Sequence, residues 1–69
     1  MTTTNEQPAN WYFSFGHGQE NFNKYVKIYG TMSGTRDEMF KLFGREWSMQ
    51  YTEEKALTAI RDWNWTELE

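Results

Sequence analysis

Histidine is the side chain best suited to proton transfer near neutral pH, and this sequence contains one, His17. A general base also needs an orienting partner, and the nearby Glu20 comes with no Ser/His/Asp pattern and no metal-ligand cluster. The lack of cysteine excludes disulfides and thiolate metal sites. The sequence therefore predicts no enzyme: no catalytic residue, no metal and no cofactor. His17 is interpreted either as a loop histidine bonded to its neighbours or as a ligand contact.

Gly16 and Gly18 flank this histidine in a pattern that resembles part of a phosphate-binding turn. A dinucleotide fingerprint needs a third glycine and a following helix, whose first N–H groups bind the phosphates. Neither follows here, so that interpretation is rejected. The loop, with Gln19 beside it, remains a candidate for contact between its backbone N–H groups and a ligand.

Aromatic and cationic side chains form a second group of candidates. Alternation places tyrosines and lysines of two strands on one sheet face, which can stack bases and neutralise phosphates. The same pattern fits a solvated face, or one covered by a second helix. Arg45 and Trp47, where the chain turns from a helix into a strand, could bring a guanidinium and an indole to the same ligand. The predicted ligand-binding residues are Tyr12, His17, Gln19, Lys24, Tyr25, Arg45 and Trp47.

The chain is unusually aromatic, with 4 Trp, 4 Tyr and 5 Phe in 69 residues. A core of this size has difficulty enclosing so many rings, each of which buries roughly 150–250 Å². The alternative is that a small domain fills its core with large side chains. Trp63 and Trp65 are predicted to form an interface, where tryptophan is enriched, and a homo-oligomer is expected.

The net charge of -3 argues against long nucleic acid as a partner, because such binders present a basic face. The 7 Lys and Arg residues are enough for a small nucleotide. No apolar run approaches the roughly 18 residues of a membrane span, and no signal peptide is recognisable, so no membrane partner and a cytoplasmic location are expected.

Hydrophobic patterning predicts one α+β domain over residues 11–69 after a disordered leader over residues 1–10. Its expected order is ββαβα(β): an antiparallel or mixed sheet of three or four strands, with one main helix packed on it and a short second helix. The strand order stays open, because the main helix allows either a parallel crossover or an antiparallel return. The expected strands cover 11–15, 24–29 and 47–51, with helices over 32–43 and 53–61 and either strand or helix over 63–68.

The main helix has two possible N-caps. Thr31 precedes the predicted helix, whereas Thr35 and Glu38 match a capping box. Gly34 is unfavourable inside a helix by about 1 kcal/mol. Gly44 is a natural helix stop.

The motifs W-Y-F-S-F-G-x-G-Q, Y-V-K-I and E-M-F-K-L-F-G-R-E-W-S-M-Q-Y-T-E-E resemble a widespread group of small phage and prophage proteins. The resemblance covers roughly residues 11–54, and Ser33 and Gly34 depart from the charged, alanine-rich helix start of that group. It implies a counter-defence role in the host cytoplasm, similar to the anti-CBASS sponge proteins that sequester cyclic nucleotide signals. It assigns no binding residue.

The expected function is therefore a non-enzymatic phage-type binding protein that sequesters a small nucleotide signal, such as a cyclic oligonucleotide. The alternative is a protein–protein inhibitor or adaptor that binds a host defence protein or nuclease through Trp63 and Trp65.

Overall fold

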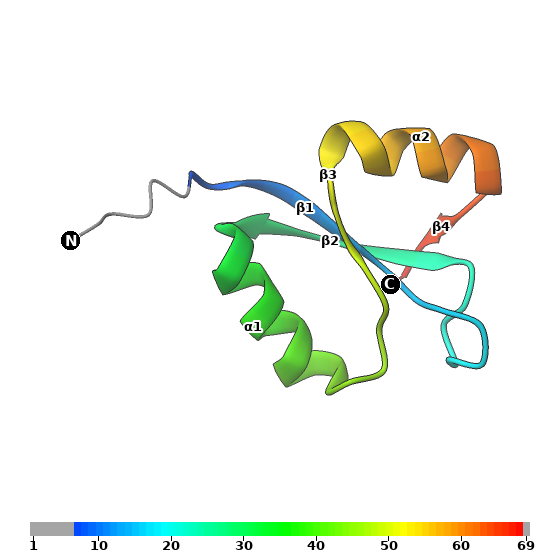
Figure 1. Cartoon of the computed structure of the whole chain (residues 1–69), viewed down its shortest axis with the longest axis horizontal. Helices are drawn as coiled ribbons and strands as arrows, with labels where there is room; N and C mark the ends of the chain where they lie inside the picture. The colour runs from blue at the N-terminus through cyan, green and yellow to red at the C-terminus, as the bar shows by residue number, and fades with distance from the viewer. Residues whose placement is uncertain (1–6, 69) are drawn as a thin grey trace.

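A four-stranded mixed sheet lies between two helices in the computed structural model, which describes residues 7–68 (Figure 1). The predicted α+β fold is confirmed. The elements in chain order are β1 (Ala9–Ser14), β2 (Lys24–Gly30), α1 (Met32–Phe43), β3 (Gln50–Thr52), α2 (Glu53–Trp63) and β4 (Thr66–Glu67). β1 begins at Ala9, ahead of the predicted start of the domain, and residues 1–6 of the predicted leader lie outside the described part.

The strand order is β3-β1-β2-β4, with β1 antiparallel to both β2 and β3. β4 pairs parallel to β2, so the chain segment after α2 adds an edge strand. This pairing involves only Lys24 and Tyr25 of β2. The outer edge of β2 beyond Tyr25 therefore has no strand partner within residues 7–68.

Alternation along β1 gives each helix its own face of the sheet. Phe13 and Phe15 point toward α1 and form the buried core with Met39. Tyr12 points to the opposite face, where its hydroxyl group donates to Glu53 of α2. Burying the large apolar side chains of β1 against α1 removes most of their surface from water, which is the main favourable term in folding.

Thr31 is the N-cap of α1, because its hydroxyl oxygen accepts a hydrogen bond from the Gly34 N–H at 3.0 Å. Thr35 instead lies inside the helix and is buried. The alternative cap at Thr35 is therefore wrong. The helix ends as predicted at Gly44, whose positive φ of 62°, with ψ of -121°, is a conformation that glycine adopts readily. Its N–H donates to the Phe40 carbonyl.

Replacing Gly34 by alanine is expected not to stabilise the protein, although alanine is favoured in helices by about 1 kcal/mol. A Cβ atom at this position would lie 2.8 Å from the Thr31 hydroxyl oxygen, so the substitution displaces the cap, which is worth about 0.5–2 kcal/mol. In a Thr31→Ala background the same substitution should stabilise by about 1 kcal/mol, because no cap remains to be lost. Urea unfolding of the four variants measures this difference. An equal gain in both backgrounds would show that the cap and Gly34 are not coupled.

The third strand is shorter and less regular than predicted. Ser48 N–H donates to the Ser14 carbonyl, and Ser14 N–H donates to the Met49 carbonyl, at 2.8 and 2.9 Å. Two residues therefore oppose one, which is a β-bulge. Trp47 packs on Phe13 at the α1 face, while Tyr51 lies at the α2 face. Strict alternation over the expected strand 47–51 would place Trp47, Met49 and Tyr51 on one face. That arrangement is wrong, because the bulge changes the register.

The two C-terminal tryptophans belong to different parts of the fold. Trp63 is the last residue of α2 and is 69% exposed, and Asn64 ends the helix in the left-handed conformation. Trp65 lies between α2 and β4, with its ring 5.8 Å from that of Tyr51. If residues 63–68 formed one strand, the two indoles would share a face; with Trp63 in α2 and Trp65 after it, they do not.

Candidate ligand-binding site

A groove lies between α1 and the connection that leads from Gly44 to β3, and is called here the α1 groove. It has a volume of about 380 Å³. A smaller extension of about 220 Å³ continues along Met32 and Gln50. The groove is lined by Arg36, Phe40, Arg45, Trp47 and Ser48.

The rings of the α1 groove are held in a fixed arrangement. Phe40 and Trp47 meet edge to face with their centroids 5.3 Å apart. The Trp47 Nε1–H donates to the Gly44 carbonyl at 3.1 Å, and the indole also packs on the buried Phe13. Since Phe40 is about half exposed, the pair presents a preorganised aromatic surface to solvent.

Two guanidinium groups flank this aromatic surface. Arg36 projects from α1 and Arg45 from the connection that follows it. Within residues 7–68 the ion pair found is Arg61–Asp62, so both groove arginines lack a carboxylate partner there. A guanidinium can donate two parallel hydrogen bonds to a phosphate or carboxylate group. The groove is therefore suited to an anion that carries an aromatic ring.

A second hollow lies between the end of β1, the β1–β2 loop and the C-terminal part of α2, and is called here the aromatic pocket. Its volume is about 350 Å³, and no Lys, Arg, Asp or Glu among residues 7–68 contributes to its lining. The rings of His17 and Phe22 lie 4.3 Å apart at an angle of 32°. The aromatic side chains that line the pocket are Phe15, His17, Phe22, Tyr51, Trp63 and Trp65.

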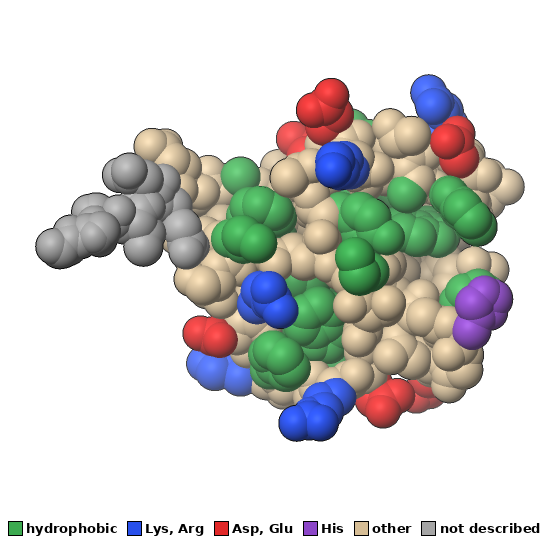
Figure 2. All heavy atoms as spheres, viewed as in Figure 1, with side chains coloured by type: hydrophobic (Ala, Val, Ile, Leu, Met, Phe, Trp, Pro, Cys, Tyr) green, Lys and Arg blue, Asp and Glu red, His purple; other side chains and the backbone are tan. Residues whose placement is uncertain are grey.

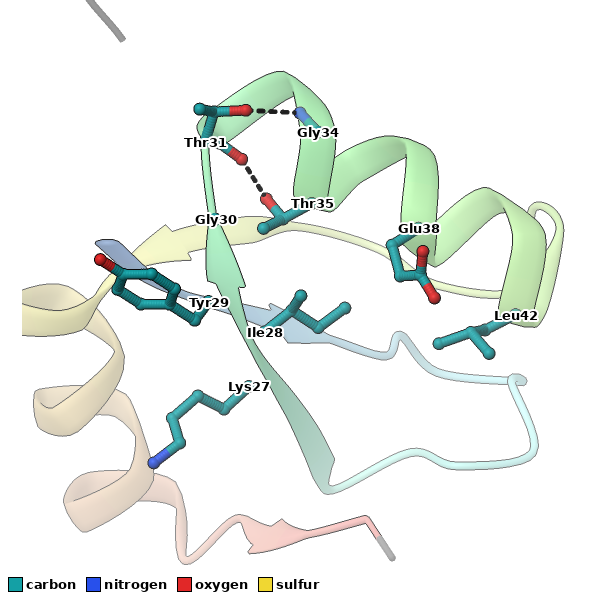
Figure 3. Close-up of a pocket in the computed structure, with 9 residues that line it drawn as sticks. All are labelled: Lys27, Ile28, Tyr29, Gly30, Thr31, Gly34, Thr35, Glu38 and Leu42. Atoms are coloured by element: carbon teal, nitrogen blue, oxygen red, sulfur yellow. Dashed lines mark hydrogen bonds between the residues drawn. The ribbon is translucent and has the colours of Figure 1, made fainter. Parts of the chain in front are cut away.

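A third hollow of about 520 Å³ follows the open edge of β2 beside the start of α1 (Figure 3). Figure 3 shows Lys27 directed away from Glu38, on the other side of β2. The Gly34 N–H and the Thr35 hydroxyl group are already bonded to Thr31. This hollow has few free donors for a ligand, and its two charged groups do not converge.

The structure separates the predicted ligand-binding residues into several places. Arg45 and Trp47 come together in the α1 groove, and His17 lies in the aromatic pocket with Trp63 and Trp65. The Gln19 side-chain oxygen accepts from the Gly16 N–H at 2.6 Å and so closes the loop on itself.

One tyrosine of the predicted stacking face, Tyr12, is covered by α2. Tyr12 is only 4% exposed and lies against Tyr25, with ring centroids 5.7 Å apart. Lys24 and Tyr25 lie at the β4 side of the sheet, whereas Arg45 and Trp47 precede β3 at the other edge. The sequence left open whether this face binds a ligand, is solvated or is covered by a second helix. For Tyr12 the structure shows coverage by the second helix.

Sequence reasoning missed Arg36 and Phe40 as site residues. Their spacing of i and i+4 places them on one face of α1, which was the signal available. That face could not be recognised as a groove wall without knowing where the chain passes after Gly44.

Burial and the neighbouring Glu53 carboxylate raise the pKa of the Tyr12 phenol above its usual value. Tyrosine in the unfolded chain ionises near pH 10, so the Tyr12 phenol stays protonated to a higher pH in the folded state than in the unfolded state. The stabilisation is complete below about pH 10 and is lost as the pH rises through the higher folded-state pKa. The stability of Tyr12→Phe should therefore fall less steeply than that of wild type between about pH 9 and 11, as measured by urea unfolding. A Tyr12→Phe stability curve that runs parallel to the wild-type curve over this pH range would contradict this assignment.

No cluster of His, Cys, Asp and Glu able to hold a metal ion occurs within residues 7–68. In the same part of the chain, neither helix has the length and apolar character that crossing a membrane would require. Comparison of the chain with protein-family models, with curated proteins and with solved structures gives no match. The case for its function therefore depends on the α1 groove and the aromatic pocket.

Proposed function

We propose that the protein is a non-enzymatic binding protein that captures a small nucleotide-type ligand in the α1 groove. The observation that carries this proposal is the Phe40–Trp47 ring pair flanked by the guanidinium groups of Arg36 and Arg45. A base stacks on the exposed ring surface, and a phosphate group accepts hydrogen bonds from one or both arginines.

The chemistry of the groove favours binding over turnover. Its two ionisable side chains are arginines, which stay protonated in proteins and cannot act as general bases. The one histidine lies in the aromatic pocket instead. The acidic net charge of -3 and the small size of the groove favour a single small anion over a long nucleic acid.

The resemblance to small phage proteins supplies the proposed biological role. In this role the protein acts in the host cytoplasm and sequesters a cyclic oligonucleotide that signals infection. A sponge of this kind needs affinity and abundance, and it needs no catalytic group. The side chains proposed for binding come from α1 and the connection after it.

Calorimetric titration with mononucleotides and cyclic di- and trinucleotides tests the proposal. Arg45→Ala should weaken binding by about tenfold, because it removes hydrogen bonds to a charged group. Lys41→Ala is the matched control: it removes the same charge from the last turn of α1, outside the lining of the groove, and should change affinity by less than about twofold. Absence of binding to every nucleotide at millimolar concentration, or equal losses in both variants, would refute the proposal.

A second candidate function is a protein–protein inhibitor or adaptor that binds a host defence protein or nuclease. It is favoured by the exposure of Trp63, together with that of Met49 and Leu57. Tryptophan is the residue type most often found to dominate binding energy at interfaces. A purified host protein that binds wild type, loses affinity with Trp63→Ala and is indifferent to Arg45→Ala would support this candidate over the first.

The homo-oligomer stays a prediction. Several large hydrophobic side chains are exposed in the single chain, which is consistent with burial against another copy. Light scattering of the purified protein across a range of concentrations measures the mass directly. A mass that stays at that of one 8.3 kDa chain would contradict the prediction.

A further inference from the structure

The α1 groove and the aromatic pocket adjoin each other at the bulge. Ser48 lines both hollows, and Met49 lines the pocket and the extension of the groove. The connection that carries these residues passes between α1 and α2, across the front of the molecule in Figure 1. Figure 2 shows hydrophobic side chains gathered over the same region, with Lys and Arg side chains on its α1 side. One molecule of sufficient length can therefore occupy both hollows.

The aromatic pocket differs from the groove in the kind of group it accepts. Its lining includes no Lys or Arg, so a phosphate group placed there would lose its hydration without gaining a cation. Its volume of about 350 Å³ is at the lower end of the roughly 300–1,000 Å³ of ligand pockets. Aromatic walls and this size fit one uncharged, flat ring system.

Two small side chains leave the space between the aromatic walls of the pocket open. Ser14 of β1 and Ala59 of α2 both line the pocket, where larger residues would fill it. The backbone N–H and C=O groups of Ser14 are already bonded to Met49 and Ser48. Ser14 is 4% exposed. Since both of its backbone groups are used, its hydroxyl group is the polar group of Ser14 that can hydrogen-bond a ligand in the pocket. The edge of a heterocyclic base carries donors and acceptors that can bond such a hydroxyl group.

We infer that the ligand has two base-like rings joined by phosphate groups, with one ring on the α1 groove and the other in the aromatic pocket. This inference rests on the proposed function and specifies its ligand class as dinucleotide-type. The phosphate groups cross near Ser48, on the side of the bulge where Arg36 and Arg45 lie. Base stacking on an aromatic side chain contributes about 1–3 kcal/mol, so the second ring should strengthen binding by about 5- to 150-fold.

Calorimetric titration with adenosine monophosphate, the linear dinucleotide pApA and cyclic di-AMP tests the inference. Wild type should bind at least one dinucleotide about tenfold or more tightly than the mononucleotide. Ala59→Leu fills the aromatic pocket and keeps a good helix former, so it should remove this gain and leave mononucleotide affinity unchanged. Trp65→Leu should act in the same direction by removing one wall. Circular dichroism and urea unfolding confirm that each variant is folded before titration.

The outcomes separate this inference from the proposed function. Mononucleotide binding that depends on Arg45, with no gain for either dinucleotide, overturns the two-ring inference and leaves the proposed function intact. A dinucleotide gain that survives both Ala59→Leu and Trp65→Leu also overturns it, because the second ring must then lie elsewhere. Absence of binding to all three nucleotides overturns both.

Discussion

Replacing Phe13 by alanine is expected to leave the protein largely unfolded at 25 °C. Phe13 has 0% exposed surface and packs against Trp47 and the core of α1. Truncating a buried phenylalanine costs about 3–5 kcal/mol. A domain of this length has a total stability of only about 3–10 kcal/mol, on the basis of 0.05–0.15 kcal/mol per residue.

Far-UV circular dichroism and urea unfolding measure this effect. Tyr29→Ala is the control, since it also removes an aromatic ring from the sheet but at a position that is 69% exposed, and it should stay folded. Phe13→Leu should lie between the two, because leucine keeps most of the apolar volume. A Phe13→Ala variant within about 1 kcal/mol of wild type would mean that the core is not centred on this residue.

Replacing Thr35 by valine is expected to destabilise the protein by about 1–3 kcal/mol, although the two side chains have nearly the same shape. The Thr35 hydroxyl group donates to the Thr31 carbonyl at 2.9 Å and accepts from the Gln50 Nε2–H at 3.1 Å. It therefore joins the first turn of α1 to β3. Valine removes both bonds in a place that water does not reach, since Thr35 is 2% exposed.

Thr58→Val is the matched control for this substitution. The Thr58 hydroxyl group also donates to a carbonyl of the preceding helical turn, but on the exposed surface of α2. Losing this hydrogen bond should lower the free energy of unfolding by less than about 0.5 kcal/mol. Adding Gln50→Leu to Thr35→Val should recover part of the loss, because the buried Gln50 Oε1 atom already has no hydrogen-bond partner within residues 7–68. Strictly additive effects in urea unfolding would contradict a coupling between Thr35 and Gln50.

Local patterns were sufficient to predict most of the elements. The alternation in β1 and the cap at Thr31 depend on neighbouring residues, and both are found as expected. The bulge at Ser48 and Met49 depends instead on two backbone hydrogen bonds to Ser14, which is distant in sequence. No side chain marks such a bulge, so the face on which Met49 and Tyr51 lie could not be derived.

In the candidate site, too, local patterns predicted some residues, whereas those that depend on contacts distant in sequence were missed. Arg45 and Trp47 were predicted because they follow the end of a helix, a place that can be recognised locally. Their partners Arg36 and Phe40 were missed because the groove exists only where the connection passes back along α1. Tyr12 was chosen for its ring, but α2 covers it, and whether a short helix covers a sheet face is decided by tertiary packing.

The bulge opposite Ser14 also bears on how related sequences can diverge. Main-chain hydrogen bonds hold Ser48 and Met49 in place, so neither side chain is needed to keep the groove and the pocket adjacent. Substitutions at these two positions can then accumulate with little effect on the fold. A single larger residue at Ser14 or Ala59 would close the aromatic pocket and leave the α1 groove open. The volume of the aromatic pocket can thus change in one mutational step while the α1 groove is kept.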